Sequence, residues 1–259
     1  MAVISNQHGM SFLGRILSGT SPKLAEDSQE KRIIAVELIC DRMLTASLLE
    51  DRRAAAQALK SVSKHYQPEV GTVALQTIVT ALKRDNEDSE TVKCLVESVI
   101  AICSEGVQFR REYGEVFMKE QESIRILLDC LQDSSQTVRF SILQLLVLLE
   151  EMISSKLAEA ILAFPAGLSR LLDLLEDSRD IIRVEAISLL CHLTASSMEF
   201  QKIAMFEGAF EKMFELIFSE GGVYGGEVIV QDALLIIQNL LRHNPPNQVG
   251  VVVFILQID

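Results

Sequence analysis

Acidic and basic residues recur at a fixed spacing along the chain, and they are the first candidates for chemistry. Asp133 precedes Arg139 by six residues, and Asp177 precedes Arg183 by the same number. A carboxylate close to a cation could form a catalytic set, but its recurrence in successive segments argues against that interpretation. An acid at a helix start with a base about one turn later suits helix capping and ion pairing between units. We therefore predict structural roles for Asp133, Arg139, Asp177 and Arg183.

Other patterns that could support chemistry are weak. The four histidines are scattered and lack the spacing of a zinc site. The glycine-rich stretch Ser219–Glu227 lacks the Gly-Lys-Ser/Thr of a phosphate-binding loop, and there is no Gly-x-Ser-x-Gly nucleophile elbow. The five cysteines are widely spread without a Cys-x-x-Cys pair, which is typical of reduced, buried thiols. We predict no enzyme activity, no metal and no cofactor.

The composition favours helices packed on helices. Apolar residues make up 49% of the 259 residues, whereas aromatic residues make up 5% and Trp is absent. Side chains such as Leu and Ala lose little rotamer freedom in a helix. The net charge of −12 argues against nucleic acid and against unaided docking on anionic lipid. No apolar run approaches the length that spans a bilayer. We expect a cytoplasmic protein whose membrane contact is peripheral and indirect.

Internal repeats are the clearest signal of fold. The segments DSSQTVRFSILQLLVLL from Asp133 and DSRDIIRVEAISLLCHL from Asp177 align, and EDSETVKCLVESVIAIC from Glu87 fits the same template. The basic position recurs with steps of 41, 46, 44 and 47 residues, at Arg52, Lys93, Arg139 and Arg183, with Val230 in the fifth slot. A period in the forties with two or three helices per unit is typical of armadillo and HEAT repeats. We predict an all-α, armadillo/HEAT-like solenoid of about five imperfect repeats.

The same register predicts which residues face outward. In each long helix, two positions four residues apart share a face, and the aligned pairs are Gln57/Ser61, Ser98/Ile102, Gln144/Leu148, Ser188/His192 and Leu235/Asn239. We predict that this stripe lines a concave, partner-binding surface. In nuclear-import armadillo proteins such a stripe carries Trp and Asn, which grip basic peptides. Here Trp is absent and Asn239 is the only asparagine in the stripe, so that mode of binding is disfavoured. The alternative is that convex loops such as Ser219–Glu227 bind the partners.

The ends of the chain depart from the repeat pattern. We expect a flexible leader over residues 1–28, a repeat domain over 29–248 that is a truncated head, and a divergent apolar tail over 249–259. The run VGVVVFIL, Val249–Leu256, is β-branched and uncharged, which predicts a strand-like tail outside the packed array. We expect a truncated or alternatively spliced product.

Four stretches carry a resemblance to a known family. They are LLEDRRAAAQALKSVSKHY (Leu48–Tyr66), GLSRLLDLLEDSRDIIR (Gly167–Arg183), FQKIAMFEGAFEKMF (Phe200–Phe214) and QNLLRHNPPNQ (Gln238–Gln248). Together they resemble the armadillo-like head of the general vesicular transport factor family, whose members are Golgi vesicle-tethering proteins. The similarity covers roughly residues 29–248 and includes loop residues as well as leucine spacing.

This resemblance implies a peripheral Golgi protein that tethers vesicles in endoplasmic-reticulum-to-Golgi and intra-Golgi transport. It implies a Rab-type small GTPase, SNARE proteins and other tethering factors as partners. In that family a long coiled coil follows the head, and a homodimer of this chain would require such a coiled coil. Without the resemblance, the residues equally suit a generic armadillo scaffold or a regulatory subunit of an unrelated cytosolic complex.

Overall fold

The computed structural model describes residues 29–221 and 228–258, with side chains as far as residue 251. Every regular element in these ranges is a helix, as predicted from the repeat pattern. The chain divides into two compact units, Met1–Phe117 and Met118–Asp259, and each is described by itself. The predicted leader and most of the glycine-rich loop lie outside the described residues.

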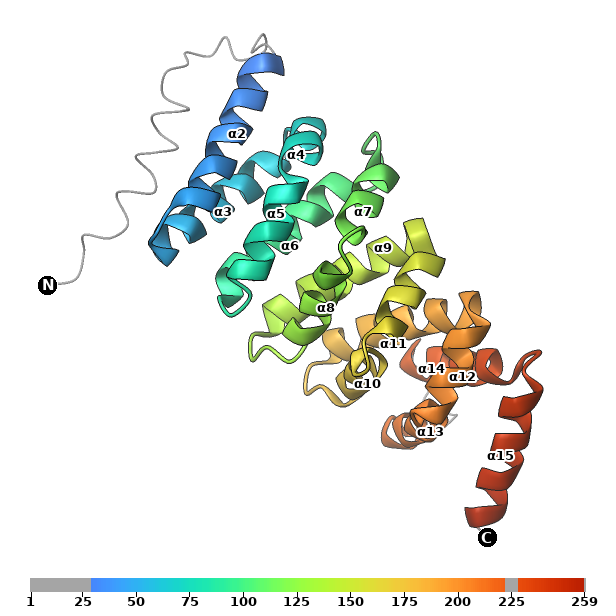
Figure 1. Ribbon diagram of the computed structural model, residues 1–259. Coiled ribbons are helices and arrows are strands. Elements are labelled where there is room, and N and C mark those ends of the chain that lie inside the picture. Colours follow the sequence, from blue (N-terminus) through green and yellow to red (C-terminus); the bar gives the residue numbers. More distant parts are fainter. Residues whose placement is uncertain (1–28, 222–227, 259) are drawn as a thin grey trace, which may run out of the picture. The chain divides into compact units, whose positions relative to one another are not determined.

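The elements of unit 1 are α2 (Gln29–Thr45), α3 (Leu49–Ser63), α4 (Gln67–Val73), α5 (Leu75–Arg84), α6 (Ser89–Cys103) and α7 (Arg110–Met118). The long helices α2 and α3 are followed by the shorter α4 and α5, the long α6 and the short α7, an alternation typical of helical repeats (Figure 1). Helix α3 packs against both α2 and α6. The core between them consists of aliphatic side chains such as Ile39, Leu59 and Leu95. Each repeat therefore buries its apolar face on its neighbour.

Local signals fix where the helices of unit 1 begin and how closely they approach. The Asp88 carboxylate caps α6 by accepting a hydrogen bond from the Thr91 backbone N–H at 3.1 Å. At Gly71 a Cβ atom would lie 2.5 Å from the Tyr113 ring, so only glycine allows α7 to approach α4 at this point. The Tyr113 hydroxyl donates to the Pro68 carbonyl oxygen at 3.4 Å.

Unit 2 continues the same alternation (Figure 1). Its elements are α8 (Gln121–Cys130), α9 (Gln136–Ala163), α10 (Gly167–Asp173), the 3-10 helix η2 (Leu174–Glu176), α11 (Asp180–Ser196), α12 (Met198–Phe206), α13 (Ala209–Ser219), α14 (Val228–Leu241) and α15 (Pro245–Ile258). Helix α11 packs against α9 and α14. Non-helical angles at Ile153 (φ −145°, ψ 44°) bend α9, so that it supplies the last helix of one repeat and the first helix of the next.

The strand-like tail predicted for Val249–Leu256 is wrong, because these residues belong to helix α15. Pro245 and Pro246 open this helix, where the missing N–H groups of proline cost no intrahelical bond. β-Branched residues lower helix propensity only slightly, so contact with neighbouring helices decides the conformation. Helix α15 contacts α12 and α14, and Val251 is buried. The boundary expected at residue 248 therefore falls inside a helix.

Candidate protein-binding surface

Arg52 in unit 1 and Arg139 and Arg183 in unit 2 each form an ion-pair contact of the same kind, and we call each contact a rung of a ladder. In every rung the guanidinium Nη1 donates to the carbonyl oxygen six residues earlier, and Nη2 reaches a carboxylate of the following repeat. The carbonyl distances are 3.2 Å from Arg52 to Ala46, 2.6 Å from Arg139 to Asp133 and 3.1 Å from Arg183 to Asp177. The carboxylate distances are 2.7 Å from Arg52 to Asp85, 2.8 Å from Arg139 to Asp177 and 3.1 Å from Arg183 to Glu220.

The acids of the ladder share one structural position. Asp85, Asp177 and Glu220 are the C-cap residues of α5, η2 and α13. Each rung thus joins the start of a long helix to the end of a second helix in the next repeat. The Asp133 and Asp177 carboxylates also accept backbone N–H bonds, from Ser135 at 2.7 Å and Arg179 at 2.9 Å. All four residues of the predicted pairs lie in these contacts, away from any convergent catalytic arrangement.

The predicted surface stripe is one residue out of register in helix α6 of unit 1. Arg52 and Arg183 each lie four residues after their helix N-caps, Leu48 and Arg179. In α6 the N-cap is Asp88, so the equivalent residue is Val92, which is buried, rather than Lys93. Counting from the N-cap places Glu97 and Ala101 in the stripe. The cap residue Asp88 is the signal in the sequence that could have corrected the alignment.

Two of the predicted partner-binding residues are therefore wrong. Ser98 is 0% exposed, and its hydroxyl donates to the Cys94 carbonyl oxygen at 2.8 Å. Asn239 is also buried, with Nδ2 donating to the Cys191 carbonyl oxygen at 3.3 Å and to Thr194 Oγ1 at 3.2 Å. Ile102, the stripe partner of Ser98, is buried as well. The amide of Asn239 holds α14 against α11 and is not available to a partner.

The remaining predicted residues are accessible. In unit 1, Gln57 and Ser61 are exposed on α3, where Ser61 Oγ donates to the Gln57 carbonyl oxygen at 2.9 Å. In unit 2, Gln144 and His192 are exposed and Ser188 is half-buried. These three lie on α9 and α11, which pack against each other. The structure thus brings together the unit 2 part of the stripe.

We define the third-helix face of unit 2 as the accessible side chains of α9, α11 and α14 in one continuous area. Its members are Gln144, Leu148, Ile181, Glu185, Ser188, His192, Asp232 and Leu235. The large apolar side chains of Ile181 and Leu235 are 51% and 43% exposed. A surface that mixes exposed apolar groups with polar groups is typical of protein-binding sites.

His192 lies at the centre of this face and connects its three helices. Its Nδ1 is 3.7 Å from Glu150 Oε2 of α9, and it acts electrostatically on Asp232 of α14. Glu150 is buried and accepts a hydrogen bond from Ser154 Oγ at 2.6 Å. The imidazole therefore covers a buried carboxylate while its other edge faces solvent.

Two carboxylates of the face are only partly solvated. Burial raises the pKa of Glu185, and burial raises the pKa of Asp232 although nearby His192 lowers it. Neither carboxylate forms an ion pair with a lysine or arginine of the described chain. A cationic or hydrogen-bond-donating partner would find unsatisfied negative charge here.

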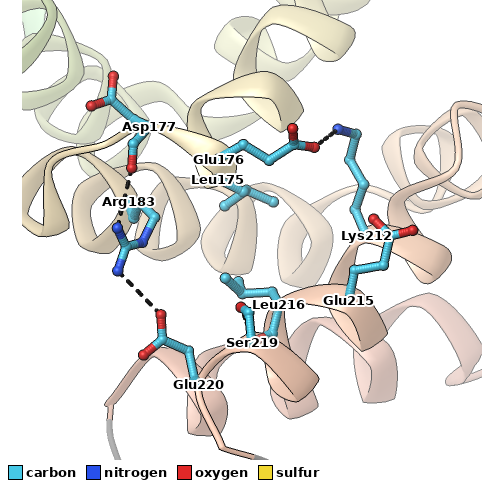
Figure 2. Close-up of a pocket in the computed structure, with 9 residues that line it drawn as sticks. All are labelled: Leu175, Glu176, Asp177, Arg183, Lys212, Glu215, Leu216, Ser219 and Glu220. Atoms are coloured by element: carbon cyan, nitrogen blue, oxygen red, sulfur yellow. Dashed lines mark hydrogen bonds and ion pairs between the residues drawn. The ribbon is translucent and has the colours of Figure 1, made fainter.

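A separate cavity of about 440 Å³ lies in unit 2 beside the contact of Arg183 with Asp177 and Glu220, away from the third-helix face. Figure 2 shows Arg183 between the Asp177 carbonyl and Glu220, and Lys212 reaching Glu176. The side chains of Leu175 and Leu216 lie between these two polar pairs. Among the residues singled out from the sequence, Asp177 and Arg183 line this cavity, as do Ser219 and Glu220 at the start of the glycine-rich stretch.

The thiols offer no reactive nucleophile among the described residues. Burial raises the pKa of Cys94 to about 11 and that of Cys103 to about 12. All five cysteines are free, and Cys40 and Cys191 are buried as well. No group of histidine, cysteine and carboxylate side chains within the described ranges could hold a metal ion. No described helix is long and apolar enough to cross a membrane.

Repeated helical units, a ladder of arginines and an accessible long-helix face define an armadillo-like repeat protein. The fold of the designed armadillo repeat protein YIII(Dq)4CqI is similar, with a TM-score of 0.62 at 18% identity, covering 92% of this chain and 96% of that one. The crystal structure of Uso1-1 has a TM-score of 0.78 at 27% identity, covering 84% of this chain and 38% of that one. The predicted fold class is confirmed.

The sequence relatives agree with this class. The chain is 35% identical over 252 residues to general vesicular transport factor p115 of Homo sapiens. The alignment covers 92% of this chain and 26% of p115. The chain is also 37% identical over 228 residues to Golgin candidate 6 of Arabidopsis thaliana. That alignment covers 83% of this chain and 24% of Golgin candidate 6. No protein-family model matches the chain.

The chain therefore belongs to the general vesicular transport factor family and corresponds to its armadillo-like head region. It spans about a quarter of the length of the curated relatives that it matches. The resemblance found from four stretches of sequence is confirmed. The relative p115 is a vesicular transport factor, which agrees with the prediction that the chain is not an enzyme.

Proposed function

We propose that this chain is a protein-binding scaffold that contributes to the tethering of transport vesicles in endoplasmic-reticulum-to-Golgi and intra-Golgi transport. The observation that carries the proposal is homology to p115 over 92% of the chain. The homology also favours this function over a regulatory subunit of an unrelated complex. The site of action is the cytoplasmic side of Golgi membranes, where the chain attaches through other proteins.

The third-helix face of unit 2 is the proposed docking surface. It places exposed Ile181 and Leu235 beside partly desolvated Glu185 and Asp232, so a partner could bury apolar area and neutralise charge together. Its partners are a Rab-type small GTPase, SNARE proteins and other tethering factors. Side chains that a partner desolvates fully near the centre of an interface contribute most to its affinity.

Two arginines introduced on this face test the proposal. Gln144→Arg combined with Ser188→Arg adds bulk and charge at accessible positions of adjacent helices. We expect capture of a GTP-loaded Rab-type GTPase of the early secretory pathway to fall by at least roughly ten-fold, a loss of about 1.4 kcal/mol. Capture is measured with the GDP-loaded GTPase alongside, and with unchanged helical circular dichroism as the folding criterion.

The matched control is Gln121→Arg combined with Ser155→Arg. Both positions are exposed, on α8 and on the part of α9 after its bend, and neither belongs to the third-helix face. The control adds the same charge and should leave capture unchanged. Equal capture by the two double variants would move the docking surface away from this face. No GTP-dependent capture by the unmodified chain would contradict the Rab assignment itself.

A further inference from the structure

The cavity beside α13 has a lining that suggests a ligand of definite charge. It is bounded by the end of the second helix of one repeat and by α13 of the next, with Leu175 and Leu216 as its apolar part. Its volume, about 440 Å³, lies within the range of clefts that hold ligands. It is large enough for one long side chain to enter from solvent.

The two cations of the lining are already neutralised. Arg183 Nη2 lies 3.1 Å from Glu220 and 3.0 Å from Asp180. Lys212 Nζ lies 2.6 Å from Glu176 and 3.7 Å from Asp173. Because each cation is shared by two carboxylates, an incoming anion would have to displace a carboxylate of the protein itself. The cavity is therefore poorly suited to phosphate or to an acidic segment.

One carboxylate at the cavity remains open. Glu215 is exposed and has no hydrogen bond or ion pair with any residue that the structure describes. Figure 2 shows it on α13 one turn from Lys212, at the edge of the cavity. Glu220 is engaged by Arg183 through Oε1, which leaves its second oxygen for another donor. The lining thus offers acceptors above an apolar surface.

We propose that this cavity receives an arginine or lysine side chain from a basic segment of a protein partner. The aliphatic part of that side chain packs on Leu175 and Leu216, and its cationic head donates to Glu215. Long basic side chains bury their stems on apolar surface while the head keeps polar partners. A guanidinium suits the site best, because its planar fork can form two parallel hydrogen bonds with one carboxylate. The site is separate from the third-helix face, so either can fail without the other.

Short peptides probe the cavity directly. Acetyl-Ala-Arg-Ala-amide and its lysine analogue are titrated into the uniformly ¹⁵N-labelled chain, and the backbone amide shifts of Leu216, Ser219 and Glu220 are followed. We expect saturable shifts with a Kd on the order of 1 mM, as befits one side chain. The norleucine peptide, which keeps the stem without the charge, and the glutamate peptide should give no saturable shift. If the norleucine or the glutamate peptide bound as tightly as the arginine peptide, the cationic assignment would be overturned. The absence of any shift with the arginine peptide would also overturn it.

A charge reversal localises the site. Glu215→Lys removes the open carboxylate without breaking an ion pair of the described residues, so the fold should persist. We expect arginine-peptide binding to weaken at least roughly ten-fold. Glu159→Lys makes the same change at an exposed position of α9 outside the cavity lining and should bind as the unmodified chain does. Equal losses in the two variants would show a general effect of net charge and would overturn the site.

Discussion

The two units stack their long helices in the same manner but treat exposed charge differently. Between α3 and α6 of unit 1, Arg53 pairs with Asp88 and Lys60 pairs with Glu97. On α11 and α14 of unit 2, Glu185 and Asp232 have no lysine or arginine partner among the described residues. On the third-helix face the exposed side chains of Ile181 and Leu235 accompany these unpaired carboxylates.

This difference distinguishes charged groups that stabilise the fold through ion pairs from charged groups that remain available to a binding partner. A pair between adjacent repeats satisfies both groups and leaves little to gain from a partner. A partly buried carboxylate without a counterion destabilises the free protein slightly, and a bound donor would relieve that cost. Unit 2 is therefore the unit whose long-helix surface has the most to gain from binding.

The largest expected effect comes from placing arginine at two positions that the repeat alignment treats as equivalent. Ser98→Arg in unit 1 puts a charged, bulky side chain at a 0% exposed site, and we expect a loss of more than about 4 kcal/mol in the free energy of unfolding. Ser188→Arg in unit 2 starts from a half-buried surface position, and we expect a change within about 0.5 kcal/mol.

Urea unfolding followed by circular dichroism measures both changes. Gln57→Arg, at an exposed position of α3, is the control for adding arginine to a long helix of unit 1. It should behave like Ser188→Arg. If Ser98→Arg were as stable as that control, the corrected register of α6 would be wrong.

Removing the acidic residue of a rung should lower the free energy of unfolding more in unit 1 than in unit 2. Asp85 in unit 1 is 4% exposed and accepts from both Arg52 and Arg84, so Asp85→Ala removes the carboxylate that two guanidinium groups share and leaves them with backbone carbonyl acceptors. We expect a loss of about 3 kcal/mol. Glu220 in unit 2 is more accessible, at 19%, and its partner Arg183 keeps Asp180 and the Asp177 carbonyl. We expect about 1 kcal/mol for Glu220→Ala.

Thermal and urea unfolding of the two alanine variants give the comparison. Asp41→Ala, which removes an acid from α2 at an exposed site, corrects for the lost charge. Equal losses for Asp85→Ala and Glu220→Ala would mean that burial does not distinguish the rungs.

The sequence allowed the fold to be predicted because the period in the forties survives imperfect repeats. The register within a repeat was harder. Lys93 fits the pattern of basic residues, yet helix α6 starts one residue earlier relative to it, and Ser98 therefore turns into the core. One residue is about 100° around a helix, which is enough to exchange a surface side chain for a buried one.

Tertiary contacts decided the features that local patterns missed. A β-branched run predicted a strand in Val249–Leu256, but contact with α12 and α14 favours the helix α15. The repeat register predicts Asn239 in the surface stripe, whereas its amide satisfies groups on α11. The cavity lining is also distributed over residues 175–220 and gives no compact motif.

Single carboxylates should also affect stability, and the dependence of that effect on pH should differ between the units. In unit 1 the Arg53 guanidinium and Thr91, against the effect of burial, lower the pKa of Asp88 from 3.8 to about 2. Its contribution to stability is fully present above about pH 4 and is lost as pH falls to about 2. This difference corresponds to about 2 kcal/mol. Asp88→Asn keeps a good helix cap and should cost about that much at pH 7, and its difference from the unmodified chain should vanish near pH 2.

Glu185 of unit 2 should show the opposite sign. Burial raises its pKa, so the ionised side chain destabilises the folded state above that pKa, and the cost disappears as pH falls below the unfolded value of 4.5. Glu185→Gln should therefore raise the free energy of unfolding at pH 7 by no more than about 0.5 kcal/mol, and the gain should shrink toward pH 4. Urea titrations at matched pH, with Glu151→Gln at an exposed site of α9 as the control, measure this difference. A loss of stability at pH 7 would reveal a cationic partner for Glu185, and the contrast between paired and unpaired surface charge would then fail.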